Sequence, residues 1–360
     1  MGVEPDARAP RAGGEGAPQV GGERAPQVGG ERTSRAGGGR RGRLRGLRRA
    51  VLAALVTGAV VLPLSAAAQP RTPAPAPAVL GPLTAATLDE AYAANRAAAA
   101  EASRMAAAHG DRQRAVADRS LAEPSRHLLA FDGRGTGLAT EVFGDLVHAE
   151  RVAVLVPGSD TGLDTYDRFR TAARALYREL ASMSGGAPVA VVAWLGYETP
   201  GTVSTTVATT GRAEQAAPRL REFVDELRGI LGRSARIALV CHSYGSVVCG
   251  RAASGTAADD IALVGSPGTG ADSAAGLHTR ARVWAGRSSG DWVEHVPHVG
   301  VDLFGTTVGL GADPVSPAFG ARVFAAGDGG HSDYFDPGSL SLTNLARIVL
   351  GETEEVVTHG

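Results

Sequence analysis

The chain has 360 residues, a formal net charge of −1 and 44% apolar side chains, so it is long enough for one large domain with tails or for two small domains. Every basic side chain other than His is Arg, and the 36 arginines are balanced by 37 acidic residues. A near-neutral chain has no strong overall positive field, so we expect no nucleic acid among its partners.

The first 68 residues differ in composition from the rest. Residues 1–49 are rich in Gly and Arg and repeat the octapeptide APQVGGER in tandem, so they cannot form a core and we expect a disordered tail. A start codon assigned too far upstream is the alternative. In residues 50–68 an apolar run follows an Arg cluster and ends in Ala-Ala-Ala, which is typical of a signal peptide cleaved after Ala68. A retained N-terminal anchor, which would attach the protein to a membrane, is the other reading. Both predict a secreted or cell-envelope-associated protein.

The next two segments lead into the main domain. Residues 69–83 are Pro- and Ala-rich and predict an exposed, semi-rigid linker. Residues 84–125 are Ala- and Arg-rich and predict one or two helices, broken near Gly110 and ended by Pro124. This short helical segment has few large apolar side chains, so we expect it to pack on the domain C-terminal to it or on a partner.

From residue 126 to 352, apolar strands alternate with amphipathic helices, and we expect residues 353–360 to form a C-terminal tail. The strands begin with a hairpin in HLLAFDGRGTGLATEVFG and continue through RVAVLVPG, PVAVVAWLG, ARIALVCHS and DIALVGSPG. Strands that are apolar throughout need cover on both faces, so the pattern predicts a mostly parallel sheet with helices on both faces. A hairpin that feeds such a sheet is typical of the α/β-hydrolase fold. Ligands bind at the C-terminal strand ends of such sheets.

The strand at 235–242 runs into the sequence CHSYG, whose serine is Ser243. A serine at a sharp turn from strand to helix presents its hydroxyl above the sheet, as the nucleophile of a hydrolase does. Gly245 is the small residue expected two positions later, whereas Cys241 stands where such motifs carry glycine. Cysteine is small enough to be tolerated there. The motif alone leaves an ordinary helix N-cap as an equally good explanation of Ser243.

Two further strand ends supply the partners that a serine nucleophile needs. A weak alcohol requires a base to take its proton and a carboxylate to orient that base, in the chain order serine, acid, histidine in this fold. Asp291 follows the strand ARVWAG, and His331 follows the strand ARVFAAG. The ordered set favours Ser243, Asp291 and His331 as a catalytic triad.

Other His and Asp residues are weaker candidates. Asp272, after the strand at 260–266, is the best alternative acid, and His295 and His298 precede the final strand. Because side chains alternate along a strand, His242 is expected to point away from Ser243 and to serve in packing.

An acyl-transfer site also needs two donors for the developing oxyanion. The turn at the serine offers the backbone N–H of Tyr244, and the loop VPGSD after the first buried strand offers that of Ser159. The alternative for VPGSD is a plain Pro-Gly turn.

The chain has two cysteines, Cys241 and Cys249, on either side of the serine. An exported protein can keep a disulfide, but helices pack on sheets at about 10 Å, whereas a disulfide needs Cα atoms within about 7 Å. We therefore expect two buried thiols by default, with a disulfide as the alternative. No Cys/His cluster has the spacing of metal ligands, so we expect no metal site.

Six segments resemble one family. AERVAVLVPGSDT, CHSYGS, SSGDWV, GLGADPVSPAFGARVF, GHSDYF and LTNLARIVLG look like an actinobacterial α/β-hydrolase family that was long classed as a domain of unknown function. The resemblance extends from about residue 127 to 351 and implies an α/β-hydrolase fold with Ser243, Asp291 and His331 as the triad. It implies no particular substrate.

The sequence therefore predicts an exported serine hydrolase that cleaves a small-molecule or lipid ester without a cofactor. Two alternatives remain open. One is a catalytically inactive cell-envelope binding protein on the same fold, and the other is an acyltransferase that uses the same triad. The loops at 197–212 and 305–318 are expected to form walls of the substrate pocket.

Overall fold

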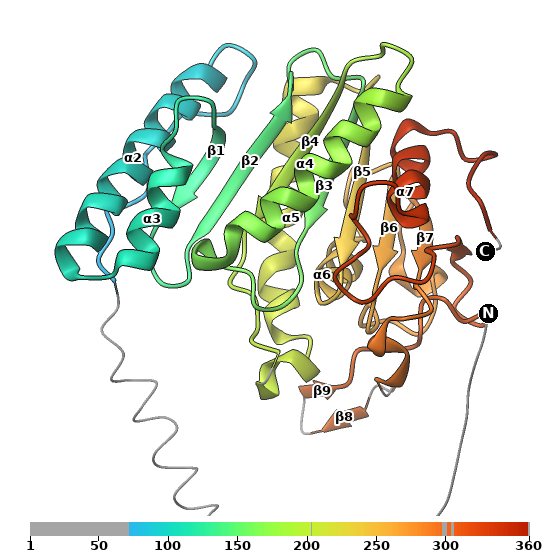
Figure 1. The fold of residues 1–360 in the computed structure, drawn as a ribbon. Helices are drawn as coiled ribbons and strands as arrows, with labels where there is room; N and C mark the ends of the chain where they lie inside the picture. Colours follow the sequence, from blue (N-terminus) through green and yellow to red (C-terminus); the bar gives the residue numbers. More distant parts are fainter. Residues whose placement is uncertain (1–71, 203, 297–300, 304–305, 359–360) are drawn as a thin grey trace, which may run out of the picture. The chain divides into compact units, whose positions relative to one another are not determined.

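The computed structural model describes residues 72–358 except 203, 297–300 and 304–305 (Figure 1). The predictions for residues 1–49 and 50–68, and for the first residues of the linker, lie outside the described residues. Within the described part of the chain, no helix combines the length and the apolar character needed to cross a membrane.

The main domain is built on an eight-stranded sheet with the order β1-β2-β4-β3-β5-β6-β7-β10. Strands β1 and β2 pair antiparallel, and β2 is also antiparallel to β4. The remaining neighbours in this order, β4-β3-β5-β6-β7-β10, all pair parallel. The predicted parallel sheet with a leading hairpin is confirmed, and this is the α/β-hydrolase fold. The strands are β1 His127–Asp132, β2 Leu138–Gly144, β3 Arg151–Val156, β4 Val189–Leu195, β5 Arg236–His242, β6 Asp260–Val264, β7 Arg282–Gly286 and β10 Arg322–Val323, with a separate hairpin of β8 Val301–Leu303 and β9 Thr306–Val308.

Helices cover both faces of the sheet. In Figure 1, α4 (Tyr166–Met183) and α7 (Leu340–Leu350) lie in front of the sheet, and α5 (Gly211–Leu231) and α6 (Gly245–Ala252) lie behind it. Each face has its own buried apolar cluster, because successive side chains of the central strands alternate between the two. Short 3₁₀ helices lie in the loops: η1 Leu163–Thr165, η2 Thr205–Ala208, η3 Ala275–Leu277 and η4 Trp292–His295.

The Ala-rich segment forms two helices, α2 (Leu88–His109) and α3 (Arg112–Leu121). They are separated at Gly110, which has the left-handed φ of 89° that favours glycine. The segment packs on the edge of the sheet, where the Asn95 amide donates to backbone carbonyl oxygens of β1. Arg126, which precedes β1, donates to the carbonyl oxygen of Ser120 in α3 and forms a buried ion pair with Glu141 of β2, the two side chains each being 2% exposed.

Candidate active site

Ser243 occupies the turn between β5 and α6, and its backbone φ is 54°. A positive φ is unusual for a serine and marks the strained turn that lifts the side chain off the sheet. The turn is tight, because a Cβ at Gly245 would lie 2.5 Å from the Val156 carbonyl oxygen. The helix N-cap is Tyr244 and receives no side-chain hydrogen bond, so Ser243 is not an ordinary capping serine.

The structure brings Ser243, His331 and Asp291 together in one hydrogen-bonded chain. Ser243 Oγ lies 2.9 Å from His331 Nε2. The other ring nitrogen, Nδ1, lies 2.9 and 3.0 Å from the two carboxylate oxygens of Asp291. With Nδ1–H donating to the carboxylate, Nε2 is free to accept the serine proton. Among the described residues no other acid bonds His331, so the alternative acid Asp272 is not its partner.

Asp291 is held in place as an ionised acceptor. Its side chain is fully buried, and it accepts hydrogen bonds from the Val293 amide at 2.9 Å and the Tyr334 hydroxyl at 2.5 Å. Burial raises the pKa of Asp291, but the hydrogen bonds from His331, Tyr334 and Val293 outweigh it and hold the pKa below its usual value. Tyr334 was not singled out from the sequence, although it lies in the same GHSDYF segment as His331.

The role predicted for His242 needs correction. Its ring does pack, but against the ring of His331, with centroids 4.9 Å apart. Its Nε2 also lies 2.8 Å from the His331 carbonyl oxygen. Burial, and then the neighbouring charge of His331, lower the pKa of His242 to about 4. A neutral His242 can donate Nε2–H to that carbonyl and so fix the backbone that carries His331. His295 is exposed at the surface, and His298 lies outside the described residues.

The loop after β3 lies against the serine, as the predicted oxyanion site requires. A Cβ at Gly158 would come within 2.6 Å of the Ser243 Cβ, so the backbone next to Ser159 passes directly beside Ser243. Among the described residues, the amides of Ser159 and Tyr244 donate to no protein acceptor. Two free N–H groups beside the serine are the donors an oxyanion needs.

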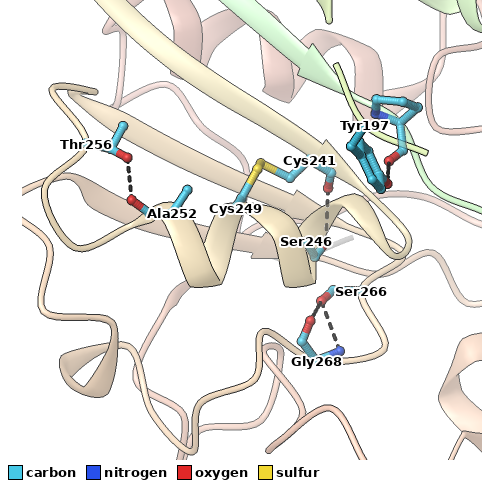
Figure 2. The surroundings of a disulfide bond; sticks show 9 residues. Tyr197, Cys241, Ser246, Cys249, Ala252, Thr256, Ser266 and Gly268 are labelled. Carbon is cyan, nitrogen blue, oxygen red and sulfur yellow. Dashed lines mark hydrogen bonds between the residues drawn. A yellow bond between two sulfur atoms is a disulfide. The ribbon is translucent and has the colours of Figure 1, made fainter. Parts of the chain in front are cut away.

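Cys241 and Cys249 form a disulfide that joins β5 to α6, as Figure 2 shows. The default expectation of two separate thiols is therefore wrong. The two Cα atoms are 6.4 Å apart, within bonding reach, because the glycine at 245 lets the helix start close to the sheet. The Ser246 hydroxyl also donates to the Cys241 carbonyl oxygen at 3.1 Å, so the turn is fixed at both of its ends.

A cavity of about 1220 Å³ opens at Ser243 and His331. Thr202, Val207 and Ala208 line it from one predicted wall loop, and Gly309 and Leu310 line it from the other. The ring of Trp292, which is 50% exposed, lies tilted by 49° against the ring of His331, with the ring centroids 4.7 Å apart. No group of three His, Cys, Asp or Glu side chains in the described part of the chain is arranged to hold a metal ion.

Comparisons with known proteins agree with this fold. A family model described as alpha/beta hydrolase matches residues 132–301. An uncharacterised protein of Mycobacterium tuberculosis is 31% identical over 264 residues, which is 64% of this chain and 39% of that protein's length. An uncharacterised protein of Mycobacterium bovis is 32% identical over 168 residues, 43% of this chain and 63% of that protein. The chain thus spans less than two thirds of the length of these relatives.

Solved structures show a more distant likeness. A serine hydrolase without a lid from Xanthomonas campestris has 15% identity and a TM-score of 0.40, and the match covers 64% of this chain and 95% of that one. Esterase PE8 has 17% identity and a TM-score of 0.39, with 59% and 97% covered. The fold assignment rests on the strand order and the family match, which together make residues 132–301 part of an α/β-hydrolase domain.

Proposed function

We propose that this protein is a serine hydrolase that cleaves a carboxylic ester through an acyl-enzyme. The observation that carries the proposal is the chain of hydrogen bonds from Ser243 through His331 to Asp291, which starts at a strained turn and faces a large cavity. A protein that kept the hydrolase fold only for binding would not need Ser243, His331 and Asp291 to be within hydrogen-bonding distance of one another.

The reaction follows from the geometry. Ser243 Oγ attacks the acyl carbonyl carbon while His331 Nε2 takes the serine proton. Asp291 stabilises the imidazolium that forms, and the amides of Tyr244 and Ser159 stabilise the oxyanion. His331 then gives the proton to the leaving alcohol, which departs and leaves the acyl group on Ser243. A water molecule, deprotonated by His331, attacks the acyl carbon, and the resulting acid leaves.

Two measurements test this mechanism on the purified protein. Wild type should hydrolyse p-nitrophenyl acetate and should be labelled by a fluorophosphonate probe, and Ser243→Ala should lose both. Removing a triad nucleophile costs about 10⁴-fold or more in kcat. Ser289→Ala is the matched control, because Ser289 is an exposed serine outside the cavity. Labelling that persists in Ser243→Ala would reject this nucleophile.

We also propose that the protein acts outside the cytoplasm, carried there by residues 50–68 as a signal peptide or an anchor. The supporting observation is the disulfide between Cys241 and Cys249, since disulfides persist in oxidising compartments and are rare in the cytosol. Fractionation of cells that express the full chain tests this. Recovery of the protein in the cytosolic fraction with both thiols reduced would contradict it.

A further inference from the structure

The cavity at Ser243 does not end at the triad but continues along one side of α4. Residues Arg168, Ala172, Ala175, Glu179 and Ser182 line it from that helix, and their spacing of three or four residues places them on one helical face. We call this extension the α4 groove. From residue 168 to 182 the helix rises by about 21 Å at 1.5 Å per residue, so the groove is long and straight.

The near end of the α4 groove adjoins the proposed nucleophile. Helix α4 follows β3, so it begins at the same edge of the sheet at which β5 ends in Ser243. The helix then runs back along the sheet, away from that edge. A chain bonded to the acyl carbon at Ser243 would therefore enter the groove at its N-terminal end and extend along α4.

The base of the groove is apolar. Ala172 and Ala175 supply only methyl groups, which leaves open space that a larger side chain on this face of α4 would fill. Further apolar lining comes from Phe335, in the segment that leads into α7, and from Leu342 in the first turn of α7, which are 7% and 1% exposed. Leu155 of β3 also lines the cavity. An unbranched hydrocarbon chain fits such a base, whereas a polar chain would find no hydrogen-bonding partners there.

The edge of the groove is built from arginine stems. Arg168, Arg174 and Arg178 line the cavity, and within the described residues they form no ion pair with an acid. An arginine can lay its methylene stem along apolar surface and keep its guanidinium in water. Farther along, Glu179 accepts a hydrogen bond from the Thr343 hydroxyl at 2.9 Å, which fixes α4 against α7.

We propose that the α4 groove binds the acyl chain of the substrate and that the protein is specific for long, unbranched acyl esters. This inference rests on the proposed function, because it places the acyl carbonyl at Ser243. The driving force is burial of the chain, and each methylene taken out of water strengthens binding by up to about fourfold. An acetyl group would leave the groove empty, an octanoyl chain would fill its near part, and a palmitoyl chain would extend toward Ser182.

The test is kcat/KM for p-nitrophenyl acetate, octanoate and palmitate, each below the concentration at which it aggregates. Wild type should prefer palmitate to acetate by at least about tenfold. Ala172→Phe should lower the palmitate-to-acetate ratio by about tenfold or more, because the ring blocks the groove one turn beyond Arg168. Ser182→Trp should lower the palmitate-to-octanoate ratio and leave the octanoate-to-acetate ratio as in wild type.

Ala181→Phe is the matched control, since Ala181 is an exposed residue of the same helix that does not line the cavity. It should keep every wild-type ratio. Ratios that are the same in Ala172→Phe and Ala181→Phe would overturn the acyl groove while leaving the hydrolase intact. Absence of any Ser243-dependent hydrolysis would overturn the proposed function and this inference with it. If Ala172→Phe fails to fold, it will not be labelled by the fluorophosphonate probe. The palmitate-to-octanoate ratio of Ser182→Trp, a change at an exposed position, then decides whether the acyl chain occupies the α4 groove.

Discussion

The disulfide beside Ser243 should contribute strongly to stability, and its loop length sets the size of the effect. Cys241 and Cys249 are separated by 8 residues. A cross-link that closes a loop this short lowers the entropy of the unfolded chain enough to stabilise the fold by about 2.5 kcal/mol. For a domain of this size, each kcal/mol moves the melting temperature by about 2–4 °C. Reduction should therefore lower the melting temperature by about 5–10 °C.

The assay is thermal unfolding, followed by circular dichroism, with and without a reductant. Both cysteines are fully buried, so the reductant acts on the unfolded chain and shifts the equilibrium as the protein melts. The double variant Cys241→Ala/Cys249→Ala is the matched control, and its melting temperature should not respond to the reductant. If the melting temperature of the wild type also stayed the same with and without the reductant, the reasoning would be refuted, because no cross-link would then constrain the unfolded chain.

Three other changes test buried groups at the edge of the sheet and beside the proposed triad. Arg126→Met should destabilise the fold by about 3 kcal/mol in urea unfolding, because it leaves Glu141 as a buried charge without its bidentate partner. Burial raises the pKa of Asp118 to about 7, so the folded state keeps a proton that the unfolded state has lost, and stability falls as pH rises from about 4 to 7. Asp118→Asn should remove that fall and be more stable than wild type at pH 8, whereas equal pH slopes would refute the assignment. Tyr334→Phe removes a donor to Asp291 and should lower kcat about tenfold or more with KM unchanged, and an unchanged kcat would show that Asp291 needs no such support.

The sheet and the hydrogen-bonded arrangement of Ser243, His331 and Asp291 could be predicted from the sequence, because both depend on local patterns in a fixed order. The two strands that lead to Ser243 and Asp291 are buried along their interiors; β5 ends at His242, directly before Ser243, and β7 ends at Gly286, a short loop before Asp291. The length of the last strand was harder to predict from the sequence. The run from 321 to 327 predicted a full strand, but only Arg322 and Val323 pair with β7. This strand lies at the edge of the sheet with a single neighbour, so no second partner extends its pairing.

The parts that sequence reasoning missed depend on contacts between distant segments. Alternation along β5 predicted that His242 points away from Ser243, but His242 lines the same cavity as Ser243 and packs against the ring of His331. No local pattern indicates that the loop carrying His331 reaches the side chain of His242. The same limit applies to Tyr334, whose role follows from its contact with Asp291 43 residues away. The disulfide was underrated for another reason: ordinary helix-to-sheet spacing was applied to a turn in which Gly245 allows a much closer approach.

The strain at Ser243 and the disulfide next to it are best understood together. Holding a residue other than glycine at positive φ costs about 1–3 kcal/mol, and the turn persists only if its surroundings enforce it. Gly158 lets its own backbone lie against Ser243, and Gly245 lets the start of α6 lie against the backbone of Val156 and Pro157 at the end of β3. The cross-link between Cys241 and Cys249 ties the strand before Ser243 to the helix after it, with a contribution of about 2.5 kcal/mol, comparable to the strain. A cysteine in place of the usual glycine before the serine is thus explained by its position, because it is the residue from which a bridge can reach across the turn and hold the serine toward His331.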